Sequence, residues 1–224
     1  MGALVYNGFD FGEFCRAKTV GISPVRRDGN GAFLPLDIQV KLMLDTGAKM
    51  DAFALSAIRH KLNAALAKGA GTLRLPEEPE LEYRSVSVAE ADPWKPLFED
   101  GSCLVAFCCA DPVAYGHERK TARDAVEVGG TYRTYPAVEL VAVEGDSVMV
   151  MDAAQERFVQ IVGAFTGGER VMLDFERERA SIDGVSADKS IGLYSDFFPL
   201  HPGVNTLIFA GCSAHTVRFA ERWV

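Results

Sequence analysis

Short apolar runs separated by turn-forming pairs fill the second half of this 224-residue chain. The runs cover residues 136–143, 147–151, 157–165, 170–175, 180–182, 206–210 and 215–223. Most of them are separated by the pairs Gly145-Asp146, Gly167-Gly168, Asp183-Gly184 and Pro202-Gly203. Such pairs favour turns, because glycine accepts positive φ angles and proline has a fixed φ. No convincing helix appears among the runs, so the region predicts an antiparallel β-sandwich.

The last run, residues 215–223, alternates most regularly. Val217, Phe219 and Trp223 fall on one side of the predicted strand. The other side carries Thr216, Arg218, Ala220 and Arg222. We therefore expect Trp223 to pack in the core. The alternative is an exposed Trp223 that stacks on a sugar, as in a stand-alone carbohydrate-binding module.

The first half of the chain mixes strands with one helix. Residues 36–42, 72–75, 83–88 and 102–107 read as strands, the first of them with strict alternation of apolar and polar residues. Between residues 48 and 68 the spacing is helical, with an apolar face formed by Leu55, Ile58, Leu62, Ala65 and Leu66. The whole chain is therefore expected to be mainly β, of the α+β class.

A change of pattern marks the expected domain boundary. The polar segment 117–127 separates the mixed first part from the series of short strands, and we read it as a link. The expected domains are residues 1–120 and residues 121–224. Within the first, Arg26-Arg27-Asp28-Gly29-Asn30-Gly31 lies between two strand-like runs and predicts a hairpin with an exposed, positively flanked tip.

One motif could indicate catalysis. Asp45-Thr46-Gly47 follows an apolar strand, as in retroviral-type aspartic proteases, where two such carboxylates meet in a homodimer and share a proton. The bracing apolar-apolar-glycine element is far away, at Ile161-Val162-Gly163, and a helix follows the motif directly. We favour a helix-capping role for Asp45 and Thr46 and keep the dimeric protease as an alternative.

Nothing else predicts a catalytic, metal or cofactor site. The histidines His60, His117, His201 and His215 lack partners at metal-ligand spacing. The five cysteines form no Cys-x-x-Cys pair, and Cys108-Cys109 read as small buried strand residues. The formal net charge of −8 argues against a nucleic-acid binder. No run approaches the roughly 20 apolar residues of a membrane span, and no secretory signal is visible, so folding in a cytoplasm is expected.

Four segments, taken in order, resemble the distal tail proteins of long non-contractile bacteriophages, the Dit family. They are the opening Val5-Tyr6-Asn7-Gly8-Phe9-Asp10-Phe11, the helix at 48–68, the segment from Val105 to Tyr115 that contains Asp111-Pro112, and the close of the chain from Ser195. In the last segment, Phe197 and Phe198 look like anchors that hold a turn to the sandwich. The resemblance spans nearly the whole chain.

The resemblance implies a structural protein without enzymatic activity or cofactor. Six copies would form a hub ring, with the first domain as a belt around a channel and the second as a galectin-like β-sandwich. The ring would join the tail tube protein to a tail-tip protein in the virion tail, after assembly in the bacterial host cytoplasm. DNA would pass through an acidic channel without specific binding.

The ring contact is expected at the hairpin tip. A closed ring of identical chains needs head-to-tail contacts, and Arg26, Arg27, Asp28 and Asn30 are the candidate interface residues. Some members of the family carry a long inserted arm that holds receptor-binding proteins. The strands of the second domain leave no room for one here, so contact with a receptor-binding protein is a weaker expectation.

Overall fold

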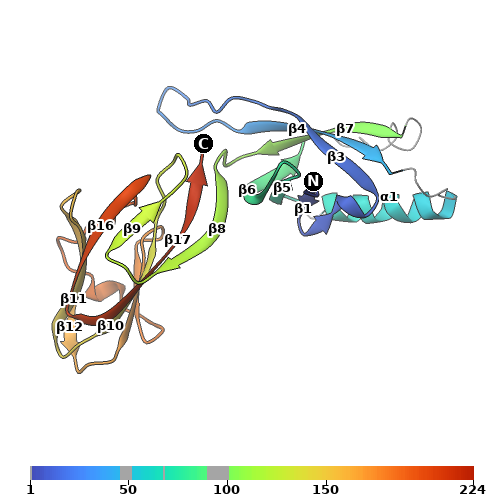
Figure 1. Cartoon of the computed structure of the whole chain (residues 1–224). Coiled ribbons are helices and arrows are strands. Elements are labelled where there is room, and N and C mark those ends of the chain that lie inside the picture. The colour runs from blue at the N-terminus through green and yellow to red at the C-terminus, as the bar shows by residue number, and fades with distance from the viewer. Residues whose placement is uncertain (1, 46–51, 68, 90–100) are drawn as a thin grey trace. The chain divides into compact units, whose positions relative to one another are not determined.

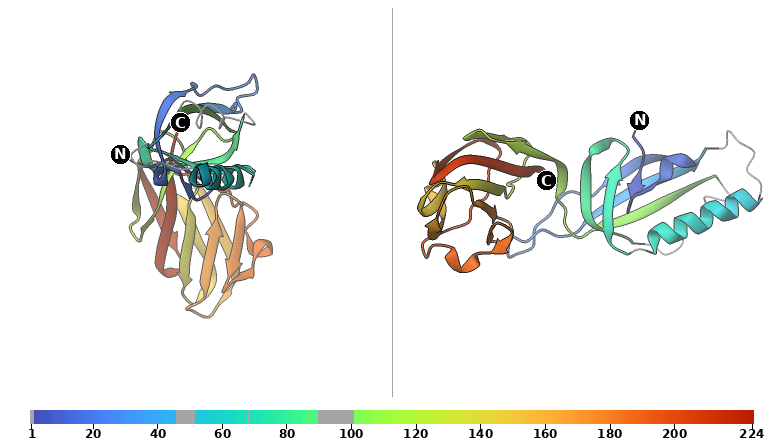
Figure 2. Two further views of the ribbon diagram at one scale, coloured as in Figure 1. Left: turned by 90° about the vertical axis from the view of Figure 1, so that its right-hand side faces the viewer. Right: turned by 90° about the horizontal axis from the view of Figure 1, so that it is seen from below.

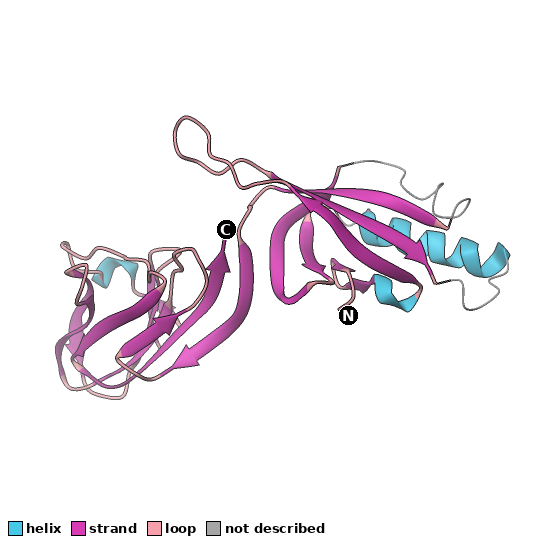
Figure 3. Ribbon diagram, turned by 45° about the horizontal axis from the view of Figure 1, so that its top comes forward, coloured by secondary structure: helices cyan, strands magenta, loops and turns pink. Residues whose placement is uncertain are grey.

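The computed structural model describes residues 2–45, 52–67, 69–89 and 101–224. The chain divides into two compact units, Met1–Gly116 together with Val224, and His117–Trp223 (Figure 1). Both units consist mainly of antiparallel strands (Figure 3). The expectation of a mainly β fold is confirmed.

The first unit is a mixed-length antiparallel sheet accompanied by a helix. Its elements are β1 (Val5–Tyr6), β2 (Phe9–Asp10), β3 (Cys15–Ile22), β4 (Leu36–Leu44), α1 (Ala52–Leu66), β5 (Gly71–Leu75), β6 (Glu78–Val88) and β7 (Ser102–Cys109), with a 3₁₀ turn at Phe11–Glu13. The strands pair in the order β2-β1-β5-β6, and β6 continues through β7 and β4 to β3. Strand β8 (Ala114–Thr121) begins in this unit, where Ala114 pairs with Tyr83 of β6.

Local sequence explains these elements well. Asn7 and Gly8 take φ values of 50° and 77°, which allow the two-residue turn between β1 and β2. In β4 the residues alternate between buried and exposed, so that Ile38, Val40 and Leu42 enter the core. The strand pattern read from the sequence at 36–42 is therefore correct.

Helix α1 covers Ala52–Leu66, inside the expected range of 48–68. Residues 46–51 and Lys68 lie outside the described part of the chain. Ala65 is buried and Ile58 is half-buried, as the helical spacing predicts.

The second unit is a two-layered sandwich (Figure 2). Its elements are the rest of β8, then β9 (Ala125–Val128), β10 (Ala137–Ala142), β11 (Gly145–Asp152), β12 (Arg157–Phe165), β13 (Arg170–Asp174), β14 (Arg179–Ile182), β15 (Val185–Ser186), β16 (Gly203–Ala210) and β17 (Cys212–Trp223), with a 3₁₀ turn at Asp188–Ser190. One layer runs β15-β14-β13-β10-β17-β8 and the other runs β12-β11-β16-β9. Buried side chains of both layers, such as Val138, Leu173, Val150 and Leu207, form one core.

The segment 117–127 is not the link that its polarity indicated. Residues 117–121 belong to β8 and residues 125–127 to β9. His117, Glu118, Arg119 and Lys120 are all exposed, so no apolar alternation reveals the strand.

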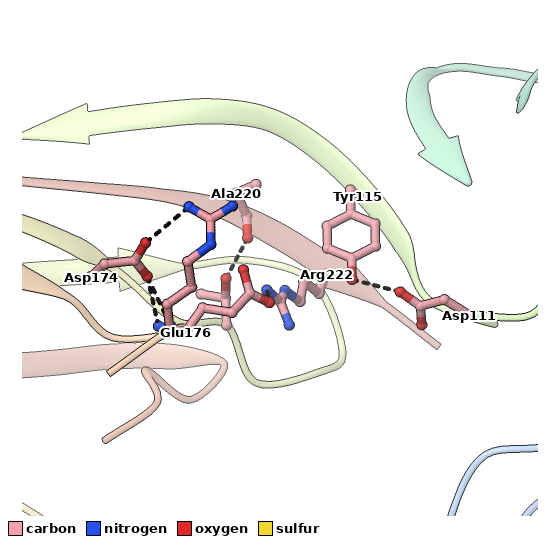
Figure 4. Close-up of polar contacts among 8 residues, drawn as sticks. Asp111, Tyr115, Asp174, Glu176, Ala220 and Arg222 are labelled. Atoms are coloured by element: carbon pink, nitrogen blue, oxygen red, sulfur yellow. Dashed lines mark hydrogen bonds and ion pairs between the residues drawn. The ribbon is translucent and has the colours of Figure 1, made fainter. Parts of the chain in front are cut away.

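The end of β17 also departs from its predicted pattern. Val217 and Phe219 are core residues, but Trp223 is only half-buried and lies outside the core cluster, so its predicted place there is wrong. Arg222, expected on the polar side, is buried, forms an ion pair with Glu176 at 2.6 Å and lies over the ring of Tyr135. Figure 4 shows this ion pair. At this end of β17 the buried side chain is therefore Arg222, paired with Glu176, and not Trp223.

Candidate interaction surface

The loop between β3 and β4 is exposed along most of its length. It covers residues 23–35 and is called here the arm; in Figure 3 it extends beyond its two strands. The strands pair up to Ile22 and Ile38, and Ser23 then bonds Asp37. The predicted hairpin is therefore present, with a longer connection than a tight turn.

Asp28 organises the tip of the arm. One carboxylate oxygen, Oδ1, accepts hydrogen bonds from the backbone N–H groups of Asn30 and Ala32, both at 2.9 Å. The backbone N–H of Asp28 donates to the carbonyl of Ala32 at 2.8 Å, and Gly31 closes the turn with a φ of 82°.

Arg27 also contacts the arm itself. Its guanidinium donates to the carbonyl of Gly31 at 2.7 Å and lies 3.9 Å from the ring centre of Phe33. Arg26 and Asn30 are exposed, and among the described residues neither side chain forms a hydrogen bond or ion pair. Two of the four candidate residues therefore shape the tip, and the other two present polar groups to solvent.

Apolar side chains lie exposed on the arm and the strand that leads into it. Val20 is 56% exposed, and Ile22, Val25 and Leu34 are exposed as well. An exposed segment that combines branched apolar side chains with a fixed, charged tip has the composition of a protein contact surface.

Asp45 directly follows β4, and its carboxylate pairs with Arg16 of β3 at 3.2 Å. Residues 46–51, between Asp45 and the described beginning of α1 at Ala52, lie outside the described part of the chain, so the capping role stays a prediction. Thr46 and Gly47 lie outside the described residues. Ile161-Val162-Gly163 belongs to β12 of the other unit, where it is part of a sandwich layer.

Three thiols of the first unit, those of Cys15, Cys103 and Cys109, are buried and poorly suited to nucleophilic chemistry, whereas Cys108, predicted to be buried, is half-buried. Burial raises the pKa of Cys15 to about 12, with a smaller contribution from Cys103, whose own pKa burial raises to about 11. Cys109 is fully buried, and burial likewise raises its pKa to about 12. Within the described ranges, no group of histidine, cysteine and acidic side chains is arranged to hold a metal ion. Likewise, none of the helices described there has the length and apolarity of a membrane span.

The aromatic pair Phe197-Phe198 behaves as the sequence predicts. Phe198 is fully buried and its ring centre lies 4.8 Å from that of Phe175. Phe197 makes a second edge-on contact with Phe175, at 5.2 Å. The turn is thus anchored to the core, and these rings are not available to a sugar.

The known proteins to which this chain is similar are phage tail components. Residues 129–223 match the family model described as the C-terminal domain of the siphovirus-type tail component. The distal tail protein of Bacillus phage SPP1 is 25% identical over 126 residues, which are 53% of this chain. The second unit is thus similar to that tail-component domain, and the chain is similar to this distal tail protein over about half of its length. The aligned segment spans about half of the length of that relative, 49%.

The structural match covers more of the chain than the sequence match does. The crystal structure of the SPP1 distal tail protein, described as a paradigm of the hub adsorption apparatus of phages that infect Gram-positive bacteria, superposes with a TM-score of 0.71. The match covers 99% of each chain at 19% identity. Both units of the present chain therefore have the fold of that distal tail protein.

Proposed function

We propose that the protein is a structural hub of a phage or prophage tail, in which six copies form a ring between the tail tube and the tail tip. The observation that supports this most strongly is the fold match to the SPP1 distal tail protein across both units. The protein would then act through its surfaces, without catalysis or a cofactor, in the virion tail after assembly in the host cytoplasm.

The arm is the proposed contact between neighbours in the ring. A head-to-tail contact joins two different surfaces of the same chain, so an extended, ordered segment suits it. Arg27 and Asp28 would hold the tip in shape, while Arg26, Asn30 and Val25 would contact the next copy. The acidic surface of the neighbour, in a chain of net charge −8, would complement Arg26.

The net charge of −8 also suits the central channel of the proposed ring. Tail DNA must pass without being held, and an acidic lining repels phosphate. The tail tube protein and a tail-tip protein would occupy the two faces of the ring.

Electron micrographs of the full chain test the ring. Rings with sixfold symmetry are expected, from the purified protein or after co-expression with the neighbouring tail proteins. Arg26→Glu should abolish them, whereas Lys189→Glu, a charge reversal at a residue of the second unit that is also exposed, should not. Particles that stay monomeric in both preparations would refute the hub.

The alternative enzyme is tested on the same material. An aspartic protease would cleave an unfolded substrate at acid pH and would lose that activity in Asp45→Asn. We expect no cleavage that depends on Asp45, because this carboxylate is exposed and pairs with Arg16. A glycan array addresses the carbohydrate-binding alternative, for which Trp223→Ala is the test variant.

A further inference from the structure

A hollow at one edge of the sandwich carries a group of cationic residues. It lies where β8, in one layer, leads into β9, in the other, and Figure 1 labels both strands. It is called here the corner pocket, and it is lined by residues 119–123 and 125–127 together with Phe219 of β17. Its volume of about 550 Å³ lies within the range of about 300–1,000 Å³ that is usual for sites of small molecules.

Hydrogen bonds fix the shape of the corner between the two strands. Thr121 Oγ1 accepts from the backbone N–H of Arg123 at 3.1 Å, and the carbonyl of Asp124 accepts from the N–H of Leu207 at 2.8 Å. Phe219 belongs to the core of the sandwich, which therefore closes the pocket on that side. Because the Thr121 hydroxyl is the acceptor in its bond to Arg123, its proton can be donated to a ligand.

The lining of the corner pocket is positively charged. Arg119, Lys120 and Arg123 are exposed cations and Glu127 is the one carboxylate of the lining, so its formal charge is +2, three positive charges less one negative. The whole chain, in contrast, has a net charge of −8. Neither Lys120 nor Arg123 forms an ion pair with another residue in the described part of the chain. A hollow lined mainly by one sign of charge concentrates the electric field and attracts ligands of the opposite sign.

Two further carboxylates near the corner pocket are engaged with other groups. Glu221 forms an ion pair with Arg119 and also accepts a hydrogen bond from the N–H of Gly129 at 2.9 Å. The carboxylate of Asp124 lies 3.4 Å from Nε2 of His215. Neither acid pairs with the two unpaired cations of the lining, whose charges therefore remain available to a ligand.

We propose that the corner pocket binds a small organic phosphate, whose phosphate group pairs with Lys120 and Arg123. A phosphate ester has a charge of about −1.5 to −2 at pH 7 and three acceptor oxygens. This charge matches two unpaired cations better than the single charge of a carboxylate does. The arginine guanidinium binds phosphate through two parallel hydrogen bonds, and the lysine ammonium acts as a point charge.

The organic part of the ligand occupies the rest of the volume. The lining there includes Ala122, Ala125 and Phe219, which offer apolar contacts beside the charged groups. Sites of small molecules commonly combine such apolar contacts with a few polar groups that orient the ligand. This inference concerns the second unit alone and does not depend on the proposed ring.

Nuclear magnetic resonance of the isotopically labelled full chain, titrated with phenyl phosphate, tests the proposal. Saturable shifts of the amide signals of residues 119–127 are expected, with a dissociation constant of about 1 mM or lower. Lys120→Gln and, independently, Arg123→Gln should each weaken binding by roughly tenfold. Lys189→Gln is the matched control, because Lys189 is an exposed lysine that lines another hollow of the second unit. The amide spectrum of each variant verifies that it folds.

Related compounds separate the effect of charge from that of the organic part. Phenyl sulfate has a similar shape with a single negative charge, and inorganic phosphate lacks the organic part, so both should bind more weakly than phenyl phosphate, by roughly threefold or more. Glu127→Gln removes the one like charge of the lining and should strengthen the binding of phenyl phosphate by roughly twofold to fivefold.

The outcomes that would overturn the proposal are distinct from failure of the hub. They are the absence of saturable binding below about 10 mM, an equal loss of affinity in Lys189→Gln, and an affinity for phenyl sulfate or inorganic phosphate equal to that for phenyl phosphate. Arg123→Gln should form the same rings as the unaltered chain in electron micrographs, because the corner pocket is not the proposed ring contact.

Discussion

Replacing Asp28 by alanine should release the tip of the arm while leaving both units folded. The substitution removes the carboxylate oxygen that accepts from the N–H groups of Asn30 and Ala32. Each hydrogen bond contributes about 0.5–1.5 kcal/mol, and exposure to water favours the lower end. The expected local loss is therefore about 1 kcal/mol per copy.

A ring magnifies this small loss. If each of six contacts requires an ordered tip, the ring loses about 6 kcal/mol in total, which is roughly a 10⁴-fold lower equilibrium constant for assembly. Sedimentation velocity at several concentrations measures the fraction in rings. Hydrogen exchange of the Asn30 and Ala32 amides measures the local opening, expected to rise by roughly fivefold.

The matched control is Asp174→Ala. Asp174 Oδ1 accepts from the N–H groups of Glu176 and Arg177 at 3.1 and 3.0 Å, so the same two kinds of bond are lost in the second unit. This variant should show similar local opening and normal rings. Unchanged rings in Asp28→Ala despite faster exchange would refute the role of the arm. Equal loss of rings in both variants would point to a general loss of stability instead.

Three further predictions concern stability. Phe198→Ala should destabilise the protein by about 3–5 kcal/mol in urea titrations because the ring is fully buried, whereas Tyr194→Ala, at a side chain 82% exposed, should change stability by at most about 0.5 kcal/mol. Hydrogen bonds from Thr166 and Gly167 lower the pKa of Glu169 from 4.5 to about 2. Its stabilisation is present above pH 4.5 and is lost as the pH falls towards 2, so Glu169→Gln should flatten this part of the acid titration of the unfolding free energy. Burial raises the pKa of Cys15 from 9.0 to about 12. The contribution of the neutral thiol to the free energy of unfolding is therefore complete below pH 9 and is lost as the pH rises towards 12. Cys15→Ala should weaken this decline of the unfolding free energy at alkaline pH.

Local pattern was sufficient for most strands of the second unit. The predicted runs at 157–165 and 170–175 correspond to β12 (Arg157–Phe165) and β13 (Arg170–Asp174). Alternation and glycine turns are encoded within a few residues, so these strands can be read without knowledge of their partners. The pairing order of the layers depends on contacts between distant segments, and no local pattern contains it.

The errors have a common physical cause. Charged residues fill the exposed part of β8, so its strand character comes from pairing and not from its own apolar pattern. Arg222 is buried because Glu176, in the turn after β13, and Tyr135, just before β10, stabilise its charge, and both are far from it along the chain. The pairing of Asp45 with Arg16 on the adjacent strand likewise depends on a residue 29 positions away, which no local pattern contains.

The run at 147–151 has a pattern that fits two kinds of strand. Apart from Ser147, the run Ser147-Val148-Met149-Val150-Met151 lacks the polar residues that should alternate with apolar ones in a sandwich layer facing water. From sequence alone, such a run indicates a strand buried on both sides. In the structure, Val148 and Val150 face the core while Met149 and Met151 lie on an outer face that carries no ion pair like that of Glu139. The run thus has the composition of a doubly buried strand although the sandwich covers it on one side only, because apolar composition does not record which side of a strand is covered.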